Sequence, residues 1–452
     1  MNAGRGILVS APGSGVGKTS FACGLVAALR RRGVAVRAAK CGPDYLDPLW
    51  LERASGAPCP NLDPWMAGPE GVRALASGAG VLVVEGAMGL YDGIRPESDE
   101  GSAAETARIL GIPVLLVVDA SGAARTVAAV VRGLRDFGDL PVAGVVANRV
   151  GSEGHANLVA EALASAGLPP LVGYVAKGAF PALAGRHLGL VPPEDDSIVS
   201  ALADAVEATV DLERILSLCR PISASASPAA PVRVGEGLRL GLAWDEAFRF
   251  AYAPTVARLE ALGVEIVRVS PLRDRELPAH LDGLWLCGGY PELHAATLSA
   301  NASMRASVAS FCERGAPVLA ECGGLLYLAR ELVDSSGRVQ AMCGVVPAVG
   351  RMGSKLRRLG YRVATARQDL FTARAGTSLR GHEFHYGALE GLPEGEWSAA
   401  WDLSDARGRS EREGWWNGSV LATWFHGWLS GGGGALEGWI DAMRAFRAGR
   451  TT

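Results

Sequence analysis

The amino-acid sequence predicts an α/β protein with two domains. Short continuous apolar runs alternate with helical patterns along most of the 452 residues, which is typical of parallel sheets covered on both faces. A glycine-rich loop joins the first run to the first helix, and a stretch rich in Pro, Ala and Ser divides the chain near its middle. We therefore expect one domain over 1–219, a linker over 220–236 and a second domain over 237–452.

The composition indicates a folded enzyme rather than a disordered or membrane-spanning chain. Hydrophobic residues make up 49% of the chain and charged residues 20%, and no apolar stretch approaches the length that a bilayer requires. The formal net charge of −3 argues against nucleic acid as the main partner. The eight cysteines lie without metal-site or disulfide spacing, so with no signal peptide in view we expect a reduced cytoplasm. The oligomeric state is left open, with a homodimer as one expectation.

The first domain is predicted from apolar β-branched runs that are separated by helical patterns. Ligands of such parallel sheets lie beyond the carboxyl ends of the strands, so the residues that follow each strand are the ones to inspect. The expected strands cover 33–37, 81–84, 114–118, 142–147 and 172–175, and the expected helices include 21–31 and 124–134.

The most informative stretch is the loop that follows the first strand, residues 6–10. Its ending, Gly17-Lys18-Thr19, matches the back of a phosphate-binding loop, in which backbone N–H groups hold phosphates, the lysine reaches the terminal ones and the hydroxyl goes to Mg²⁺. Pro12 stands where the standard spacing has its first glycine. We expect ATP to be bound by Gly13, Gly15, Gly17, Lys18 and Thr19, with Asn148 and Arg149 placed to meet the base.

Polar segments follow two other strands of this domain, at residues 40–48 and 85–93. Carboxylates at strand ends that face a phosphate loop suit Mg²⁺, which prefers hard oxygen ligands. The expected ligands are Thr19, Asp47 and Glu85, with Asp44 close behind. The alternative that one or two of these acids only cap helices or turns stays open.

The alternation restarts after the linker and predicts a second α/β unit. Its centre is the sequence Ala320-Glu321-Cys322-Gly323-Gly324, in which a strand ends, a cysteine follows and two glycines open a helix. This is the form of a nucleophile elbow, with Ala320 in place of the usual first glycine, and the helix dipole is expected to lower the pKa of the thiol. The expected strands are 238–243, 264–269, 283–286 and 317–319, and the expected helices are 252–262 and 304–314.

A nucleophilic cysteine needs a base, and His426 is the preferred candidate. It lies at the end of an apolar run late in the same domain, which suits a residue that folds back onto Cys322. His382 and His385 are rivals whose alternative role is a packed polar turn. A third, orienting acid is not evident after His426.

Seven ordered motifs give the chain a close resemblance to the cobyrinate and hydrogenobyrinate a,c-diamide synthases of cobalamin biosynthesis. The resemblance runs from about residue 6 to about residue 428. The motifs lie at residues 42–48, 85–93, 186–190, 287–294, 321–324, 359–362 and 381–386.

The resemblance implies a ligase with an N-terminal domain similar to the dethiobiotin-synthetase-like P-loop group and a C-terminal domain similar to class I glutamine amidotransferases. It maps the nucleophile onto Cys322 and its base onto His426, in a subgroup that also lacks the third acid. Its substrates are ATP, glutamine and a corrinoid polycarboxylate, with Mg²⁺. The implied oxyanion donors are Gly288 and Gly289, and the implied substrate and acyl-phosphate site comprises Lys40, Asp44, Tyr45, Leu46 and Asp92.

One departure and three alternatives bear on the substrate. Members of the family carry a histidine shortly after the Asp-Pro, where this chain has Leu49-Trp50-Leu51. The acceptor could instead be nickel sirohydrochlorin, since closely similar enzymes form its a,c-diamide. A regulatory or partition ATPase would need no cysteine elbow, and a dethiobiotin-type ligase has no glutaminase domain.

Overall fold

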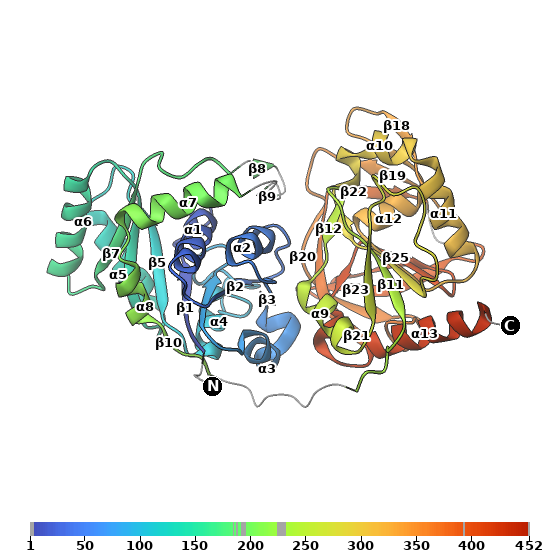
Figure 1. The fold of residues 1–452 in the computed structure, drawn as a ribbon, viewed down its shortest axis with the longest axis horizontal. Coiled ribbons are helices and arrows are strands. Elements are labelled where there is room, and N and C mark those ends of the chain that lie inside the picture. Colours follow the sequence, from blue (N-terminus) through green and yellow to red (C-terminus); the bar gives the residue numbers. More distant parts are fainter. Residues whose placement is uncertain are drawn as a thin grey trace. The chain divides into compact units, whose positions relative to one another are not determined.

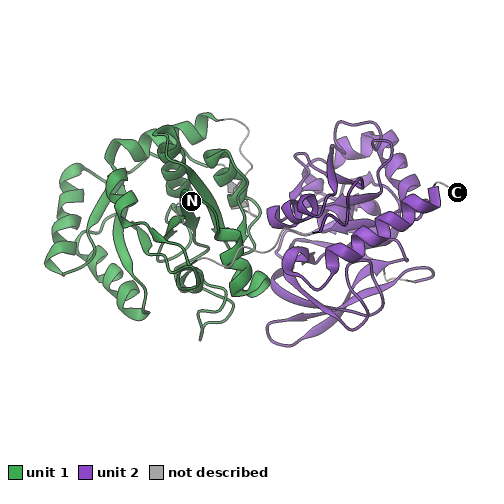
Figure 2. Ribbon diagram, turned by 60° about the horizontal axis from the view of Figure 1, so that its bottom comes forward, with its two compact units in different colours: residues 1–228 green, residues 229–452 purple. Residues whose placement is uncertain are grey.

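The computed structural model describes residues 4–183, 196–223, 232–391 and 394–450, together with the backbone of 185–186 and 189–190. Its contacts divide the chain into two compact units, Met1–Pro228 and Ala229–Thr452 (Figure 2). The motif at 186–190 and the middle of the expected linker, 224–231, lie outside the fully described residues. Among the described helices, none is long and apolar enough to cross a membrane.

The first unit is a parallel sheet with helices on both faces (Figure 1). Its strands follow the order β3-β2-β4-β1-β5-β6-β7, and the short β10 pairs with β1 in the antiparallel sense. The strands are β1 (Arg5–Ser10), β2 (Val36–Cys41), β3 (Asn61–Leu62), β4 (Val81–Glu85), β5 (Val114–Asp119), β6 (Val142–Val150), β7 (Leu171–Ala176) and β10 (Arg220–Pro221).

Two apolar clusters cover the two faces of this sheet. One cluster takes its helical residues from α1, α2, α7 and α8, and the other from α3, α4, α5 and α6. Continuous apolar strands such as Val81–Glu85 therefore bury both of their faces, as the sequence predicts. The helices are α1 (Lys18–Arg31), α2 (Asp47–Ser55), α3 (Pro64–Ala76), α4 (Ala103–Leu110), α5 (Arg125–Phe137), α6 (Glu153–Ser165), α7 (Ser197–Thr209) and α8 (Leu212–Leu218).

Two expectations about this unit need correction. The strand expected at 33–37 begins later, at Val36, because Gly33 has a φ of 75° and forms the turn after α1. The segment expected to open the linker instead begins with β10, whose Cα partners include Arg5↔Pro221. Ile222, directly after it, is 8% exposed and packs in the core of the first unit.

The second unit contains a ten-stranded mixed sheet of order β13-β11-β14-β16-β25-β24-β23-β20-β21-β26. The pairs from β13 to β25 are parallel, and those from β25 to β26 are antiparallel. The parallel strands are β11 (Arg239–Ala243), β13 (Glu265–Val269), β14 (Gly283–Leu286), β16 (Val318–Glu321) and β25 (Val420–Thr423). The antiparallel strands are β20 (Arg358–Ala366), β21 (Ser378–His385), β23 (Ser398–Asp405), β24 (Ser410–Trp416) and β26 (His426–Gly427).

Smaller elements and helices complete the second unit. A four-stranded sheet joins β18 (Val339–Ala341), β17 (Ala329–Val333), β19 (Val346–Met352) and β22 (Gly387–Glu390), and β12 (Phe248–Phe250) pairs with β15 (Gly288–Gly289). The longer helices are α9 (Ala253–Ala261), α11 (Ala302–Glu313) and α13 (Ala435–Arg450), and the shorter ones are α10 (Ala295–Ala300) and α12 (Gly323–Leu328).

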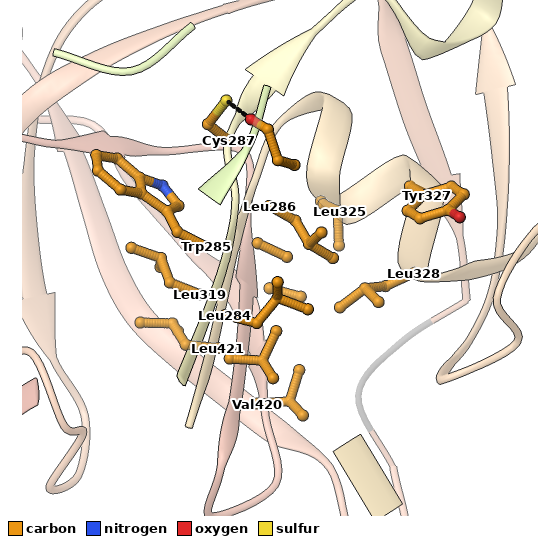
Figure 3. Close-up of a cluster of buried hydrophobic side chains, with 14 of the residues drawn as sticks. Leu284, Trp285, Leu286, Cys287, Leu319, Leu325, Tyr327, Leu328, Val420 and Leu421 are labelled. Carbon is orange, nitrogen blue, oxygen red and sulfur yellow. Dashed lines mark hydrogen bonds between the residues drawn. The ribbon is translucent and has the colours of Figure 1, made fainter. Parts of the chain in front are cut away.

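The core of this unit lies around β14 (Figure 3). Leu284 and Leu286 are fully buried beside residues of β16 and β25, and the thiol of Cys287 donates to the carbonyl of Ala243 at 3.2 Å. This packing fixes the carboxyl ends of β14, β16 and β25 as neighbours, because those strands pair directly or through one another. The residues that follow these three strands form the second site described below.

Candidate functional site

The first site is built on the glycine-rich loop between β1 and α1. Gly15 and Gly17 have φ values of 76° and 97°, a region that favours glycine. A Cβ atom on Gly17 would lie 2.4 Å from the Nδ2 atom of Asn148, so a larger residue does not fit there. That Nδ2 donates to the carbonyl of Val16 at 2.7 Å, and the end of β6 therefore supports the loop.

Arg149 provides a second support for the same loop. Its guanidinium donates to the carbonyl of Gly15 at 2.8 Å and pairs with Asp119 at the end of β5. Asn148 and Arg149 are the residues expected near the nucleotide base. Both line the cavity beside the loop, so they border the site as well as supporting the loop.

A buried cluster of charges faces the loop. Lys40 at the end of β2 is 3% exposed, and its Nζ lies 2.6 Å from Asp47 Oδ2 and 3.0 Å from Glu85 Oε1. The hydroxyl of Thr19 donates to Glu85 Oε1 at 2.6 Å and lies 3.4 Å from Asp47 Oδ2. Of the three residues that the sequence predicts as magnesium ligands, Thr19 thus lies against both Asp47 and Glu85, and Lys40 joins the two carboxylates.

The protonation of this cluster follows from burial and mutual charge. Burial raises the pKa of Glu85 to about 7 although Lys40 opposes it, and burial together with Asp47 raises the pKa of Asp44 to about 6. Burial alone would lower the pKa of Lys40, but Asp47 and Glu85 outweigh it and raise that pKa well above its usual range. Burial and Lys40 lower the pKa of Lys18 to about 8.

A cavity of about 690 Å³ opens over this cluster. Asp44 lines it and also accepts hydrogen bonds from the backbone N–H groups of Leu46 and Asp47, so its role in a turn is observed and its role as a metal ligand stays a prediction. Asp92 is not among the lining residues, because its carboxylate accepts from the N–H of Gly89 and holds a turn. The predicted residues that line the cavity are Gly15, Gly17, Lys18, Thr19, Lys40, Asp44, Asp47, Glu85 and Asn148.

Three other predicted residues lie beside this cavity rather than in its wall. The carbonyl of Gly13 accepts from Lys18 Nζ at 2.8 Å, which holds the lysine back on its own loop. Tyr45 and Leu46 are 8% and 5% exposed and are buried between β2 and α2. The structure therefore gives Gly13 a contact with the loop lysine and the other two a place in the packing.

Whether these residues suit Mg²⁺ can be judged from their oxygen atoms. The Oε2 atom of Glu85 is buried and has no hydrogen-bond partner within the described part of the chain, while Oε1 is engaged by Thr19 and Lys40. A buried carboxylate oxygen left without a donor is costly unless a cation or a water meets it. The described residues contain no cluster of three or more His, Cys, Asp or Glu side chains that could hold a metal. This donor set therefore fits a cation that shares its shell with phosphate oxygens.

The second site is a nucleophile elbow at the end of β16. Cys322 has a φ of 49°, is 7% exposed and leads into α12. Its N–H donates to the carbonyl of Thr423 at 2.7 Å, which fixes the turn against β25. A Cβ atom on Gly324 would lie 2.0 Å from the carbonyl of Leu286, so glycine is required where α12 crosses β14. The elbow predicted from the sequence is present in the structure.

The protonation of the thiol differs from the expectation. Burial, aided by the charge of Glu292, raises the pKa of Cys322 far above its ordinary value. The expected lowering by a helix dipole is not seen, because α12 has only six residues and desolvation outweighs the bond from the N–H of Gly323. The thiol is therefore neutral at rest and needs a base to become a nucleophile.

His426 and the two glycines of β15 lie against the elbow. A Cβ atom on Gly288 would lie 2.5 Å from Cε1 and 3.3 Å from Nε2 of His426, and one on Gly323 would lie 2.9 Å from the N atom of Gly289. Burial lowers the pKa of His426 to about 3, so the ring is neutral and can accept a proton. The structure thus brings Cys322, His426, Gly288 and Gly289 together at the carboxyl ends of neighbouring strands.

The two rival histidines occupy opposite faces of β21. His385 stacks on Trp424 at 4.1 Å between ring centroids, and its Nδ1 lies 2.8 Å from the carbonyl of Gly387. His382 is the direct Cα partner of His426 across the ladder between β21 and β26. The packed role that the sequence leaves open for this pair is thus filled by His385, while His382 borders the elbow.

Two carboxyl side chains near the elbow, the buried Glu321 and the partly buried Glu413, are absent from the sequence-based candidates. The Oε1 and Oε2 atoms of Glu321 accept from the N–H of Gly427 at 3.2 Å and from the indole of Trp285 at 2.8 Å. Glu413 accepts from Thr423 and from the N–H of Trp424. The position of Glu321 directly before Cys322 was the one available signal for it, whereas Glu413 becomes a neighbour only through the pairing of β24 and β25.

Family models match both halves of the chain. The model described as the CobQ/CobB/MinD/ParA nucleotide binding domain covers residues 7–178, and the model described as the CobB/CobQ-like glutamine amidotransferase domain covers residues 239–433. The first match includes the loop and its acids, and the second includes Cys322 and His426. The predicted fold class, a P-loop domain followed by a glutamine amidotransferase domain, is confirmed.

Full-length relatives carry the same two halves in the same order. The chain is 44% identical over 97% of its length to a protein from Syntrophotalea carbinolica called "Cobyrinate a,c-diamide synthase", covering 98% of that protein. It is 40% identical over 95% of its length to a protein from Agrobacterium fabrum called "Hydrogenobyrinate a,c-diamide synthase", covering 99% of it. It is 39% identical over 97% of its length to a "Cobyrinate a,c-diamide synthase" from Salmonella typhimurium, covering 98% of it. With both sites assembled and the similarity extending from end to end, the chain belongs to the family of cobyrinate and hydrogenobyrinate a,c-diamide synthases.

Proposed function

We propose that this protein uses ATP and glutamine to convert the a and c acetate carboxylates of cobyrinate or hydrogenobyrinate into amides. The observation that carries the proposal is the presence of two complete sites in one chain. One site has Lys18, Thr19 and two carboxylates at a phosphate loop, and in the other His426 lies against Gly288 while Gly289 lies against Gly323, the residue after Cys322. Full-length relatives that bear these substrate names support the choice of acceptor.

The first unit activates the carboxylate, because a carboxylate does not react with ammonia at neutral pH. An oxygen of the acetate attacks the γ-phosphorus of ATP, the bond to the β-phosphate oxygen breaks, and ADP and an acyl phosphate form. Lys18 and the N–H groups of the loop balance the charge of the transferring phosphoryl group. Lys40 holds Asp47 and Glu85 in place beside Thr19.

Thr19, Asp47 and Glu85 are the residues that would hold Mg²⁺ in this unit. The Oε2 atom of Glu85, which has no partner among the described residues, and the hydroxyl of Thr19 are the hard oxygen donors that such an ion prefers. When bound, the ion supplies positive charge to the phosphate oxygens during transfer.

The second unit supplies the ammonia. Cys322 attacks the side-chain amide carbon of glutamine as His426 accepts the thiol proton, and the N–H groups near Gly288 and Gly289 donate to the oxyanion. His426 returns the proton to the leaving nitrogen, so ammonia departs and a glutamyl thioester remains. Water then hydrolyses the thioester to glutamate and restores the thiol. Ammonia attacks the acyl phosphate, and inorganic phosphate leaves as the amide forms.

The test is an incubation with ATP, Mg²⁺ and glutamine that offers cobyrinate, hydrogenobyrinate and nickel sirohydrochlorin separately, with product masses as the readout. We expect two amidations of cobyrinate or hydrogenobyrinate. Diamidation of nickel sirohydrochlorin alone would assign a different acceptor, and no amidation of any of the three would contradict the proposal.

Cys322→Ser separates this ligase from a regulatory ATPase. We expect the variant to lose glutamine-dependent amidation and to keep amidation driven by added ammonium, because the first unit is unchanged. If glutamine-dependent amidation survived in the variant, the assigned nucleophile would be wrong.

A further inference from the structure

His382 lies at the second site but has no role in the reaction described above. It lies on β21 directly opposite His426 on β26, with Gly381 opposite Gly427 as the adjoining pair. Residues directly opposite in an antiparallel ladder project to the same face with Cβ atoms about 4.5–5.5 Å apart. Two imidazoles therefore lie side by side at the edge of the elbow.

The surroundings of His382 leave one of its nitrogen atoms unsatisfied. The residue is 7% exposed, and its Nδ1 atom is buried with no hydrogen-bond partner within the described residues. The ring of Tyr361, which pairs with His382 across β20 and β21, stands edge-on at 5.6 Å between centroids. A buried polar atom without a partner lowers stability, so the presence of one at this position points to a role in binding or reaction.

The neighbouring carboxylates are engaged elsewhere. Glu321 accepts from Gly427 and Trp285, and Glu413 accepts from Thr423 and Trp424. Glu383 follows His382 on the strand, so it projects to the opposite face, where Arg362 binds it at 2.7 Å. These three acids already have donors, and the neutral imidazole of His382 is the group that flanks His426 on its own face.

The charge state of both rings suits this role. Burial lowers the pKa of His382 to about 3, with a further contribution from Arg362, so the ring is neutral and one of its nitrogen atoms can accept a hydrogen bond. His426 becomes an imidazolium when it accepts the proton of Cys322. A buried imidazolium needs an acceptor for the N–H that points away from the nucleophile, as the acid of a nucleophile–histidine–acid triad provides.

We propose that His382 is a positioning residue of the glutaminase. Its ring accepts a hydrogen bond from His426 in the charged form and orients that ring toward Cys322. The proton in this hydrogen bond stays on His426, and no covalent bond to His382 forms or breaks. This inference rests on the proposed function, because it requires Cys322 and His426 to act as nucleophile and base.

Two substitutions at position 382 separate positioning from packing. His382→Asn keeps a polar atom near the place of Nδ1, whereas His382→Leu fills the space without an acceptor. We expect His382→Leu to lower kcat for glutamine hydrolysis on the order of 10- to 100-fold with little change in KM, and His382→Asn to recover most of this loss. Equal losses in both variants, or a wild-type kcat in His382→Leu, would overturn the proposal.

A second readout does not depend on glutamine. The rate at which iodoacetamide alkylates Cys322 can be followed against pH, with Cys322→Ser as the blank for the other cysteines. We expect slower alkylation near neutral pH in His382→Leu, because His426 is then a poorer base. An unchanged profile in His382→Leu would also overturn the proposal.

His385→Asn is the matched control. His385 is 6% exposed, lies three residues further along the same strand and stacks on Trp424, so its replacement disturbs packing on the opposite face. We expect lower thermal stability with an unchanged alkylation profile. Ammonium-driven amidation reports the proposed function separately: if wild-type protein shows it and the position-382 variants are indistinguishable from wild type in hydrolysis, only the inference about His382 fails.

Discussion

The two sites both occupy the carboxyl ends of parallel strands, but they stabilise their buried polar groups in opposite ways. In the first unit Lys40 is fully charged and lies between Asp47 and Glu85 within 3.0 Å of each. In the second unit burial keeps Cys322 and His426 neutral, with the thiol pKa raised and the imidazole pKa lowered to about 3. The first site keeps its groups charged by pairing them, and the second keeps its groups neutral by burying them away from water.

The difference matches the chemistry of each half. Phosphoryl transfer requires permanent charge around the phosphates, because there is little covalent work for the protein to do. A cysteine glutaminase requires a proton to move between two neutral groups, so its charge appears only when substrate is present. The carboxyl end of a parallel strand can therefore serve phosphoryl transfer or thiol chemistry. Which of the two it serves depends on whether the neighbouring strands supply carboxylates or backbone N–H groups. Four expected outcomes test it.

The largest effect is expected from Glu85→Gln, with Asp47→Asn as its companion. Each change removes a hard oxygen ligand and an ion-pair partner of Lys40, so ATP-driven amidation should fall on the order of 10³-fold or more. Basal glutamine hydrolysis should persist, since its residues belong to the other unit. The measurement compares amide formation with glutamate release, and amidation that survives both changes would refute the metal assignment.

Lys40→Met tests the ion-pair cluster through stability. Removing one partner of a buried charge network leaves Asp47 and Glu85 uncompensated, so the free energy of unfolding should fall by about 3–5 kcal/mol. Denaturant titration with EDTA present gives the value, and Lys177→Met, at an exposed position, serves as the control. A loss no larger than that of the control would mean that the cluster does not depend on the lysine.

Gly288→Ala tests the close packing of the second site. The new Cβ atom would lie 2.5 Å from Cε1 of His426, so the ring must shift away from the elbow. We expect glutamine hydrolysis to fall about 10- to 100-fold while ammonium-driven amidation is kept. Gly449→Ala, where a Cβ atom meets nothing within 4 Å, should leave hydrolysis unchanged. Full hydrolysis in Gly288→Ala would place His426 elsewhere in the working enzyme.

The smallest effect, taken over a single pH unit, concerns acid stability. The pKa of His382 is about 3 in the folded protein and about 6.5 in the unfolded chain. Its contribution to the free energy of unfolding is therefore present above pH 6.5 and is lost as the pH falls toward 3. For each pH unit below 6.5, the free energy of unfolding of the wild type should fall by about 1.4 kcal/mol relative to that of His382→Asn.

The difference between the two proteins is the quantity to measure. Glu321 and Glu413, whose pKa values are raised to about 7 and about 8, oppose the histidine in the total. Because both proteins contain these acids, their effect cancels when the unfolding free energies are subtracted. A difference that stays constant with pH would show that His382 is not desolvated.

Much of the fold could be predicted from the sequence because the relevant signals are local. Apolar runs bounded by turns predicted β4, β5 and β14 close to their observed limits, since a parallel strand that is buried on both faces must be apolar throughout. The antiparallel strands from β20 to β24 were not anticipated. Their pairing joins residues far apart in the chain, and their alternation is weakened by polar residues on the inward side, such as the buried Glu383.

The sequence by itself determined the chemistry of the protein. The glycine-rich loop, the carboxylates after the strands, the Cys322 elbow and His426 are residue types whose spacing along the chain already limits the reactions they can perform. Only the tertiary structure decided their neighbours and their charges. It placed Lys40 between two carboxylates, His382 opposite His426 and an engaged Glu321 behind Cys322. The physical reason is that desolvation and pairing depend on every element that packs around a group, and those elements come from distant parts of the sequence.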